Sequence, residues 1–174
     1  GSAVEQLCED VALVSCPVVL IDRLTQCGWC DAVGFDNYLG GRLAAQYLLE
    51  GGHTRIGIVT GDIAESSAAE RRRGFVDAIE QSGKHFDSSL CVEGDYRFDS
   101  GYRAANQIID GGATAVFCCN DVMALGFRQR MAERGLHVTE DMQVIGYDNI
   151  LKRFGLGWRM TTVEQSVTCL LYTS

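Results

Sequence analysis

The 174-residue sequence is short of features that mark several large classes of protein. It contains a single proline, Pro17, and no apolar run near the ~20 residues that a membrane-spanning helix needs. Its 15 basic residues are outnumbered by 23 acidic ones, and the resulting net charge of −8 repels the phosphate backbone of nucleic acids. We therefore expect no membrane partner and no direct contact between this segment and DNA.

Motifs of common enzyme classes are also missing. No Gly-x-Gly-x-x-Gly or P-loop follows an apolar run, so nothing indicates binding of nucleotide phosphates. No Gly-x-Ser-x-Gly turn supplies a hydrolase nucleophile. His53, His85 and His137 lie far apart in the sequence, without further ligands at metal-binding spacing. We expect a protein that is not an enzyme, with no catalytic residue, metal or cofactor.

The eight cysteines form no evident disulfide framework, and we expect free thiols in a reducing cytosol. The pair Cys27 and Cys30 has the spacing of a redox dithiol. However, Asp31-Ala-Val follows it instead of a helix, so the dipole that lowers a thiol pKa is missing. A thiol–disulfide oxidoreductase remains a minor alternative.

Five apolar runs that each end in polar residues dominate the sequence. They occupy residues 18–22, 56–62, 91–96, 115–121 and 144–149. Helix-like segments separate most of them, which predicts an α/β fold with a doubly wound parallel sheet. Ligands bind along the carboxyl edge of such sheets. The side chains that this edge would collect are Asp22, Asp62, Tyr96, Asn120 and Asp148.

Helix signals lie between these runs. Asp36 or Asn37 can cap a helix in which Leu39, Leu43, Tyr47 and Leu48 share one face. Ser67 to Glu70 forms a capping box. Two later helices are expected to begin at Asp99, with Tyr102, Ala105 and Ile109 inward, and at Asn120 or Asp121, with Met123, Phe127 and Met131 inward.

Several strand-end residues allow both a functional and a purely structural interpretation. At most one arginine of the run 71–73 can face the crevice, because successive helical residues point about 100° apart. Spacing alone favours a solvated basic face for this run. Tyr96 could stack on a sugar or base, or close the edge of the core. Asn120 and Asp148 could bind ligand hydroxyls while also serving as a helix cap and a turn former.

The order and spacing of the motifs resemble the effector-binding domain of the lactose/galactose-repressor (LacI/GalR) family of bacterial transcription regulators. The resemblance covers about residues 15–165. The motifs that carry it are Pro17–Arg23, Asp36-Asn37 with Gly40-Gly41, Gly52–Gly57, Arg71 before Gly74-Phe75, Gly94-Asp95 with Gly101-Tyr102, Ala115–Asp121 with Met123–Gly126, Val144–Asn149 and Thr161–Gln165.

This resemblance implies two Rossmann-like subdomains around a ligand cleft, as in periplasmic sugar-binding proteins. It also implies a homodimer that binds operator DNA through an N-terminal helix-turn-helix absent from this segment. The function implied is the ligand-sensing core of a cytoplasmic transcription regulator, with a sugar or related metabolite as effector and a purine as an open alternative. Carried over by position, the ligand contacts fall on Asp22, Ser67, Arg71, Tyr96, Asn120 and Asp148.

The resemblance also divides the chain. Residues 1–23 would be a remnant of the N-terminal subdomain, 24–165 the C-terminal subdomain, and 166–174 a truncated or non-native tail. The strand at 18–21 would then lack its sheet partners and expose an apolar edge. A solute-binding receptor of a sugar transport system shares the fold and remains the main alternative function.

Overall fold

The computed structural model describes residues 9–10, 13–21, 31–153, 155 and 159–165. The chain divides into two compact units, one formed by Gly1–Asp36 with Ser166–Ser174 and the other by Asn37–Gln165. Among the residues discussed above, Asp22, Cys27 and Cys30 lie outside the described residues.

In the first unit, β1 (Val19–Ile21) pairs in parallel with β2 (Asp31–Val33). The expectation that the first strand has no sheet partner is therefore wrong, because β2 supplies one. β2 belongs to the first of the two compact units, and the second begins at Asn37. The division of the chain into subdomains at residue 24 stays a prediction. The Val19 side chain remains 55% exposed.

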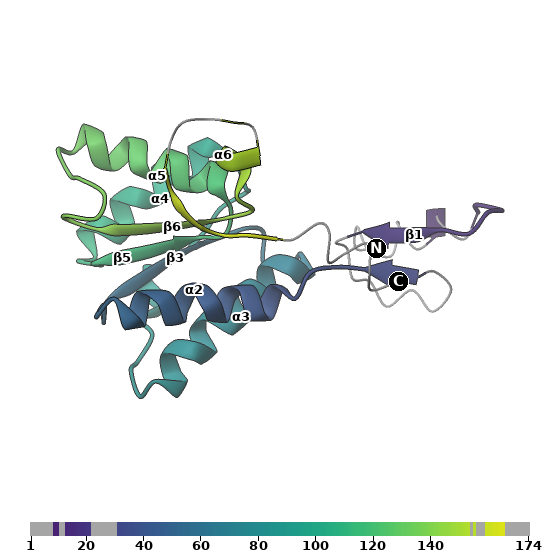
Figure 1. Cartoon of the computed structure of the whole chain (residues 1–174), viewed down its shortest axis with the longest axis horizontal. Helices are drawn as coiled ribbons and strands as arrows, with labels where there is room; N and C mark the ends of the chain where they lie inside the picture. Colours follow the sequence, from purple (N-terminus) through teal and green to yellow (C-terminus); the bar gives the residue numbers. More distant parts are fainter. Residues whose placement is uncertain (1–8, 11–12, 22–30, 154, 156–158, 166–174) are drawn as a thin grey trace. The chain divides into compact units, whose positions relative to one another are not determined.

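The second unit is built on a five-stranded sheet in which every pairing is parallel (Figure 1). Its strands, in spatial order, are β4 (Cys91–Glu93), β3 (Ile56–Thr60), β5 (Ala115–Cys118), β6 (Gln143–Tyr147) and β7 (Thr161–Val163). β3 and β5 are buried along their whole length, as expected of strands covered on both faces.

Helices cover both faces of this sheet, which confirms the predicted doubly wound α/β fold. In Figure 1, α2 (Asn37–Glu50) and α3 (Ser66–Gln81) lie on one face, and α4 (Phe98–Asp110) and α5 (Asp121–Glu133) lie on the other. The remaining helical elements are the short η1 (Ser88–Leu90) and α6 (Ile150–Arg153).

Aromatic and sulfur-containing side chains fill the core on both sides of β5. Phe75 of α3 stacks on Phe117 of β5, with ring centroids 5.4 Å apart. On the other face, Met123, Phe127 and Met131 of α5 are fully buried, as their helical spacing predicted.

Each helix pair is held together by reciprocal glycines. A Cβ at Gly41 of α2 would overlap the backbone of α3, and one at Gly74 of α3 would overlap the backbone of α2. The same arrangement recurs between Gly101 of α4 and Gly126 of α5. Backbones can approach this closely only where no side chain separates them.

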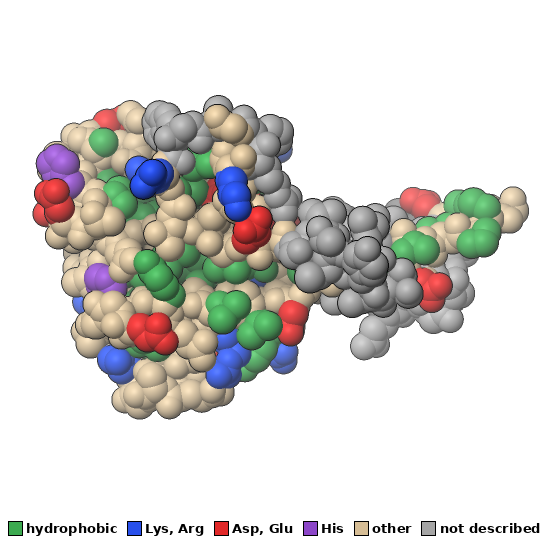
Figure 2. Space-filling view, viewed as in Figure 1, with side chains coloured by type: hydrophobic (Ala, Val, Ile, Leu, Met, Phe, Trp, Pro, Cys, Tyr) green, Lys and Arg blue, Asp and Glu red, His purple; other side chains and the backbone are tan. Residues whose placement is uncertain are grey.

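This close packing corrects two sequence-based expectations about buried helix faces. In α2 mainly small residues face inward. Of the predicted face, Leu48 is fully buried, whereas Leu39, Leu43 and Tyr47 are each 47% exposed. Figure 2 shows hydrophobic side chains gathered over this helix. In α4, Tyr102 and Ile109 are only partly buried, and Ser100, Gly101, Ala104, Ala105 and Ile108 form the buried face instead.

Candidate functional site

The carboxyl ends of the central strands define one edge of the large sheet. Among the described residues, four non-glycine residues have a positive φ, and three of them follow strands at this edge: Tyr96 (+63°), Asp148 (+99°) and Asn149 (+56°). Such conformations cost about 1–3 kcal/mol each and concentrate at ligand-binding positions. The backbone strain therefore lies where the sequence pattern predicted a site.

Arg71 lies beside this edge and is almost completely buried, with 4% of its surface exposed. Its Nε donates to Asn37 Oδ1 at 2.8 Å, and its Nη1 donates to the carbonyl oxygen of Cys119 at 2.7 Å. The guanidinium carbon lies 3.8 Å from the centroid of the Tyr147 ring. The solvated basic face favoured by spacing holds for Arg72 and Arg73, which are exposed, but not for Arg71.

Tyr96 packs its ring over the end of β3. A Cβ at Gly61 would overlap this ring, so the glycine is what allows the aromatic side chain to lie there. Burial raises the pKa of the Tyr96 phenol, and the charge of Arg71 and the Ser67 hydroxyl oppose this effect. Ser67 is close enough to act on the phenol but does not form a well-aligned hydrogen bond with it.

Ser67, in the first turn of α3, is partly buried, but it does not form the expected capping box. The helix begins at Ser66, its N-cap is Glu65 without a capping side-chain bond, and Glu70 instead bonds to Arg73 at 2.6 Å. The pair Glu70 and Arg73 satisfies the carboxylate that the capping box would have used.

Asn120 is buried and makes two structural contacts through its side-chain amide. Its Oδ1 accepts from the backbone N–H of Met123 at 2.8 Å, which confirms the predicted N-cap of α5. Its Nδ2 donates to the carbonyl oxygen of Tyr96 at 2.9 Å. Asn120 therefore links the ends of β4 and β5 and holds the strained Tyr96 backbone in place.

The acidic candidates at this edge differ in position. The backbone N–H of Asp148 donates to the carbonyl oxygen of Val163 at 2.9 Å. Burial raises the pKa of the Cys119 thiol and of the Tyr147 phenol, and the charge of Asp148 adds to this effect. Asp148 therefore belongs to the surroundings of Arg71. Asp62 is exposed and uses its carboxylate to accept from the backbone N–H of Ala64.

Two residues that hold Arg71 were not among the predicted site residues. The sequence pattern indicates Asn37 only as a helix cap and Tyr147 only as part of an apolar strand. A polar residue at the start of a helix gives no sign of a partner that lies 34 residues away. A tyrosine at a strand end was a usable signal for an arginine platform, since aromatic faces attract guanidinium groups.

A second buried polar group, Asp121, fastens the neighbouring loop. Its Oδ1 accepts from the Thr162 hydroxyl at 2.6 Å, and its Oδ2 accepts from the backbone N–H of Ile150 at 2.7 Å. Burial raises the pKa of this carboxyl, and these hydrogen bonds oppose the rise. Asp121 thus ties α5 to β7 and to the segment that follows Asp148.

The two cysteines that end β5 are buried thiols. Burial raises the pKa of Cys119 to about 12 and that of Cys118 well above its ordinary value. Both thiols are therefore protonated and poor nucleophiles at neutral pH. Among the described residues, no group of three or more His, Cys, Asp or Glu side chains is placed to hold a metal ion.

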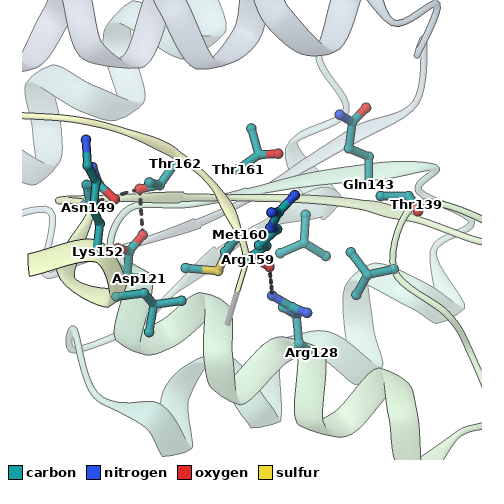
Figure 3. Close-up of a pocket in the computed structure, with 13 residues that line it drawn as sticks. Asp121, Arg128, Thr139, Gln143, Asn149, Lys152, Arg159, Met160, Thr161 and Thr162 are labelled. Carbon is teal, nitrogen blue, oxygen red and sulfur yellow. Dashed lines mark hydrogen bonds between the residues drawn. The ribbon is translucent and has the colours of Figure 1, made fainter. Parts of the chain in front are cut away.

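A cavity of about 670 Å³ lies elsewhere, between α5, β6 and β7 (Figure 3). Figure 3 shows Arg128 donating to the carbonyl oxygen of Arg159, at 3.0 Å, with Thr162 bonded to Asp121. None of the five predicted ligand contacts that the structure describes lines this cavity. No helix in the described part of the chain is long and apolar enough to cross a bilayer.

Comparison with known families agrees with this architecture. Residues 45–170 match the family described as periplasmic binding protein-like domain, and the chain belongs to this family. The HTH-type transcriptional repressor PurR of Pasteurella multocida (strain Pm70) is 38% identical over 154 residues, which cover 87% of this chain and 46% of that protein. PurR of Vibrio atlanticus (strain LGP32) is 36% identical over 151 residues, or 86% of this chain and 45% of that protein.

Solved structures give the same result. A LacI family transcriptional regulator from Enterococcus faecium, with bound ribose, has a TM-score of 0.85 and 29% identity, covering 98% of this chain and 64% of that one. CcpA of Lactococcus lactis also has a TM-score of 0.85, with 25% identity over 98% of this chain and 63% of that one. The chain is thus an effector-binding domain of the LacI/GalR type, and it spans about half the length of the curated relatives it matches.

Proposed function

We propose that this chain is the ligand-sensing part of a bacterial transcription repressor and binds a small polar effector at the carboxyl edge of the large sheet. The observation that carries the proposal is the coincidence of backbone strain at Tyr96 and Asp148 with the buried, oriented guanidinium of Arg71. Strain of this kind persists where a site is preorganised for a ligand. Under this proposal Asp22, Ser67 and Asn120 complete the set of contacts.

The proposed effector is a sugar or a related ring compound, with a purine base as the alternative. Tyr96 offers an aromatic surface for either kind of ring. Arg71 retains N–H groups beyond the two used by Asn37 and Cys119, since a guanidinium carries five. The relatives named PurR and the ribose-bound structure of the Enterococcus faecium regulator supply the two classes to test first.

A ligand panel tests the site directly. We expect isothermal titration calorimetry with pentoses, hexoses and purine bases to identify one class that binds the chain. Tyr96→Ala should weaken binding by about 10-fold or more, because a stacking contact of about 1–3 kcal/mol is lost. Tyr102→Ala, which removes a partly exposed tyrosine from α4, is the matched control. Equal losses in both variants, or no binding by any compound, would contradict the proposal.

Operator binding is proposed to reside outside this segment, and a repressor that acts on DNA would work in the cytoplasm. The excess of acidic residues supports a segment that does not bind DNA by itself. We expect no mobility shift when the chain is mixed with operator-length duplexes at physiological salt. A saturable shift under these conditions would show that the segment carries its own DNA-binding surface.

The homodimer implied by the family has a candidate surface on α4 and α5. Phe98 is 40% exposed beside a groove of about 750 Å³ that Leu125, Leu136 and Leu151 help to line. An aromatic side chain at an apolar groove is typical of a protein interface. We expect Phe98→Asp to shift a dimer to monomer in sedimentation velocity, whereas Leu43→Asp on α2 should not. A monomer at all concentrations of the unmodified chain would refute this assignment for the segment.

A further inference from the structure

We infer that the effector is a sugar that carries a negatively charged group, a carboxylate or a phosphate, and that this group pairs with Arg71. This choice of ligand class rests on the proposed function, because it takes Arg71 as an effector contact. It narrows that function from sugars and purine bases in general to acidic sugars. The observation behind it is a buried positive charge that contacts only neutral groups.

The contacts of Arg71 hold its guanidinium without balancing its charge. They come from the amide oxygen of Asn37, the carbonyl oxygen of Cys119 and the ring of Tyr147, all of which are neutral. In the part of the chain that the structure describes, no salt bridge involves Arg71. An arginine keeps its proton in proteins, and a buried charge without an opposite charge is costly. A negatively charged ligand group would remove this cost.

Arg130 shows which contact Arg71 lacks. Like Arg71, it donates from Nε to an asparagine Oδ1, that of Asn106 at 2.9 Å, and its guanidinium lies over a tyrosine ring, 5.3 Å from the centroid of Tyr102. Arg130 also donates from Nη1 to the Glu133 carboxylate at 3.2 Å. The partly exposed arginine therefore has a carboxylate partner, whereas the buried arginine has none among the described residues.

Two acidic residues of the second unit have other tasks. Asp121, the other buried charged side chain among the described residues, uses its carboxylate oxygens to accept from Thr162 and from the backbone of Ile150. Asp148 lies in the surroundings of Arg71, but no salt bridge joins the two side chains. Neither carboxylate is therefore the ion-pair partner that Arg130 has.

An acidic sugar matches the groups at this edge. Its ring can lie against the aromatic surface of Tyr96, and its hydroxyl groups can donate to Asp148. Its carboxylate or phosphate can accept from Arg71 in a charge-assisted hydrogen bond, which is roughly twice as strong as a neutral one. The hydroxyl groups and the acidic group of the ligand thus contact different residues.

Matched sugars test the charge directly. Glucose, glucuronate and glucose 6-phosphate differ only in carrying a hydroxyl, a carboxylate or a phosphate at one carbon, and ribose and ribose 5-phosphate form a second series. In isothermal titration calorimetry, we expect a charged member to bind about 10-fold more tightly than its neutral counterpart, or better. The two charged arms identify the acidic group. Arg71→Met should abolish the difference, and Arg130→Met should leave it unchanged.

Asn37→Asp provides a test that needs no ligand and remains available if Arg71→Met does not fold. It places a carboxylate where the amide oxygen now accepts from Arg71 Nε at 2.8 Å. We expect the melting temperature of the empty chain to rise by about 3 °C, because the buried charge gains a partner, and the preference for charged sugars to disappear. Asn106→Asp is the matched control, since Arg130 already has Glu133, and should change the melting temperature by less than about 1 °C.

The possible failures can be told apart. Equal binding of neutral and charged members, or tighter binding of ribose, glucose or hypoxanthine, would overturn the choice of an acidic sugar and leave the proposed effector site standing. An Asn37→Asp chain that melts no higher than the original would also overturn it, because Arg71 would then need no negative partner. No binding by any of these compounds would refute the proposed function together with the ligand class.

Discussion

Replacing Gly126 by alanine should separate α4 from α5 and destabilise the second unit. A Cβ at this position would lie 2.9 Å from both the carbonyl carbon of Phe98 and the backbone nitrogen of Tyr102, and nearer still to the Phe98 carbonyl oxygen. Carbon–oxygen contacts between helices normally measure about 3.3–3.6 Å. These neighbours are backbone atoms, so no side-chain rotation can relieve the overlap, and the helices must move apart by about 1 Å.

The expected cost follows from two opposing effects. Overpacking against a rigid neighbour costs about 1–3 kcal/mol, and a backbone neighbour places Gly126→Ala at the upper end of that range. Alanine is a better helix former than glycine by about 1 kcal/mol, which offsets part of the cost. The free energy of unfolding should therefore fall by about 2 kcal/mol.

Urea denaturation followed by far-UV circular dichroism measures this change. Gln129→Ala, an exposed substitution one turn further along the same helix, should remain within about 0.5 kcal/mol of the original chain. Gly101→Ala should resemble Gly126→Ala, and the double variant should cost less than the sum, because the first substitution already separates the helices. A Gly126→Ala chain as stable as the original would refute the close approach of α4 and α5.

Three further predictions concern the carboxyl edge of the sheet. Asp148→Gly should raise the free energy of unfolding by about 1 kcal/mol in urea denaturation, because glycine tolerates a φ of +99°, and it should weaken effector binding. A lower free energy of unfolding would contradict the assignment of backbone strain to Asp148. Tyr96→Phe should be at least as stable as the original chain, because it removes a buried hydroxyl that has no well-aligned hydrogen bond. A clearly lower melting temperature in this variant would disprove this. The Cys119 thiol has a pKa of about 12 in the folded chain, against 9.0 for an ordinary thiol. Its protonated form therefore stabilises the fold fully below pH 9, and this stabilisation is lost as the pH rises toward 12. Between pH 9 and 10 the unfolding free energy should drop by up to about 1.4 kcal/mol more in the original chain than in Cys119→Ala, and identical pH profiles would contradict this.

The strands, the α/β class and the cap of α5 could be read from the sequence because they depend on local patterns. Apolar runs between helical segments identify buried parallel strands wherever they occur. Asn120 caps the helix that immediately follows it, and a contact three residues away is visible in the sequence. The motifs that carry the family resemblance depend on order and spacing, which are also properties of the sequence.

Tertiary structure alone decided the environment of Arg71 and the buried face of α2. Arg71 bonds to Asn37 and to Cys119, which lie 34 and 48 residues away, and no local pattern encodes contacts at that separation. In α2, hydrophobicity predicted burial of the face that includes Leu39 and Leu43. Close packing against α3 at Gly41 buries the glycine and alanine face instead, because backbones that approach this closely leave no room for a large side chain at the point of contact; of the predicted face, Leu48 is buried.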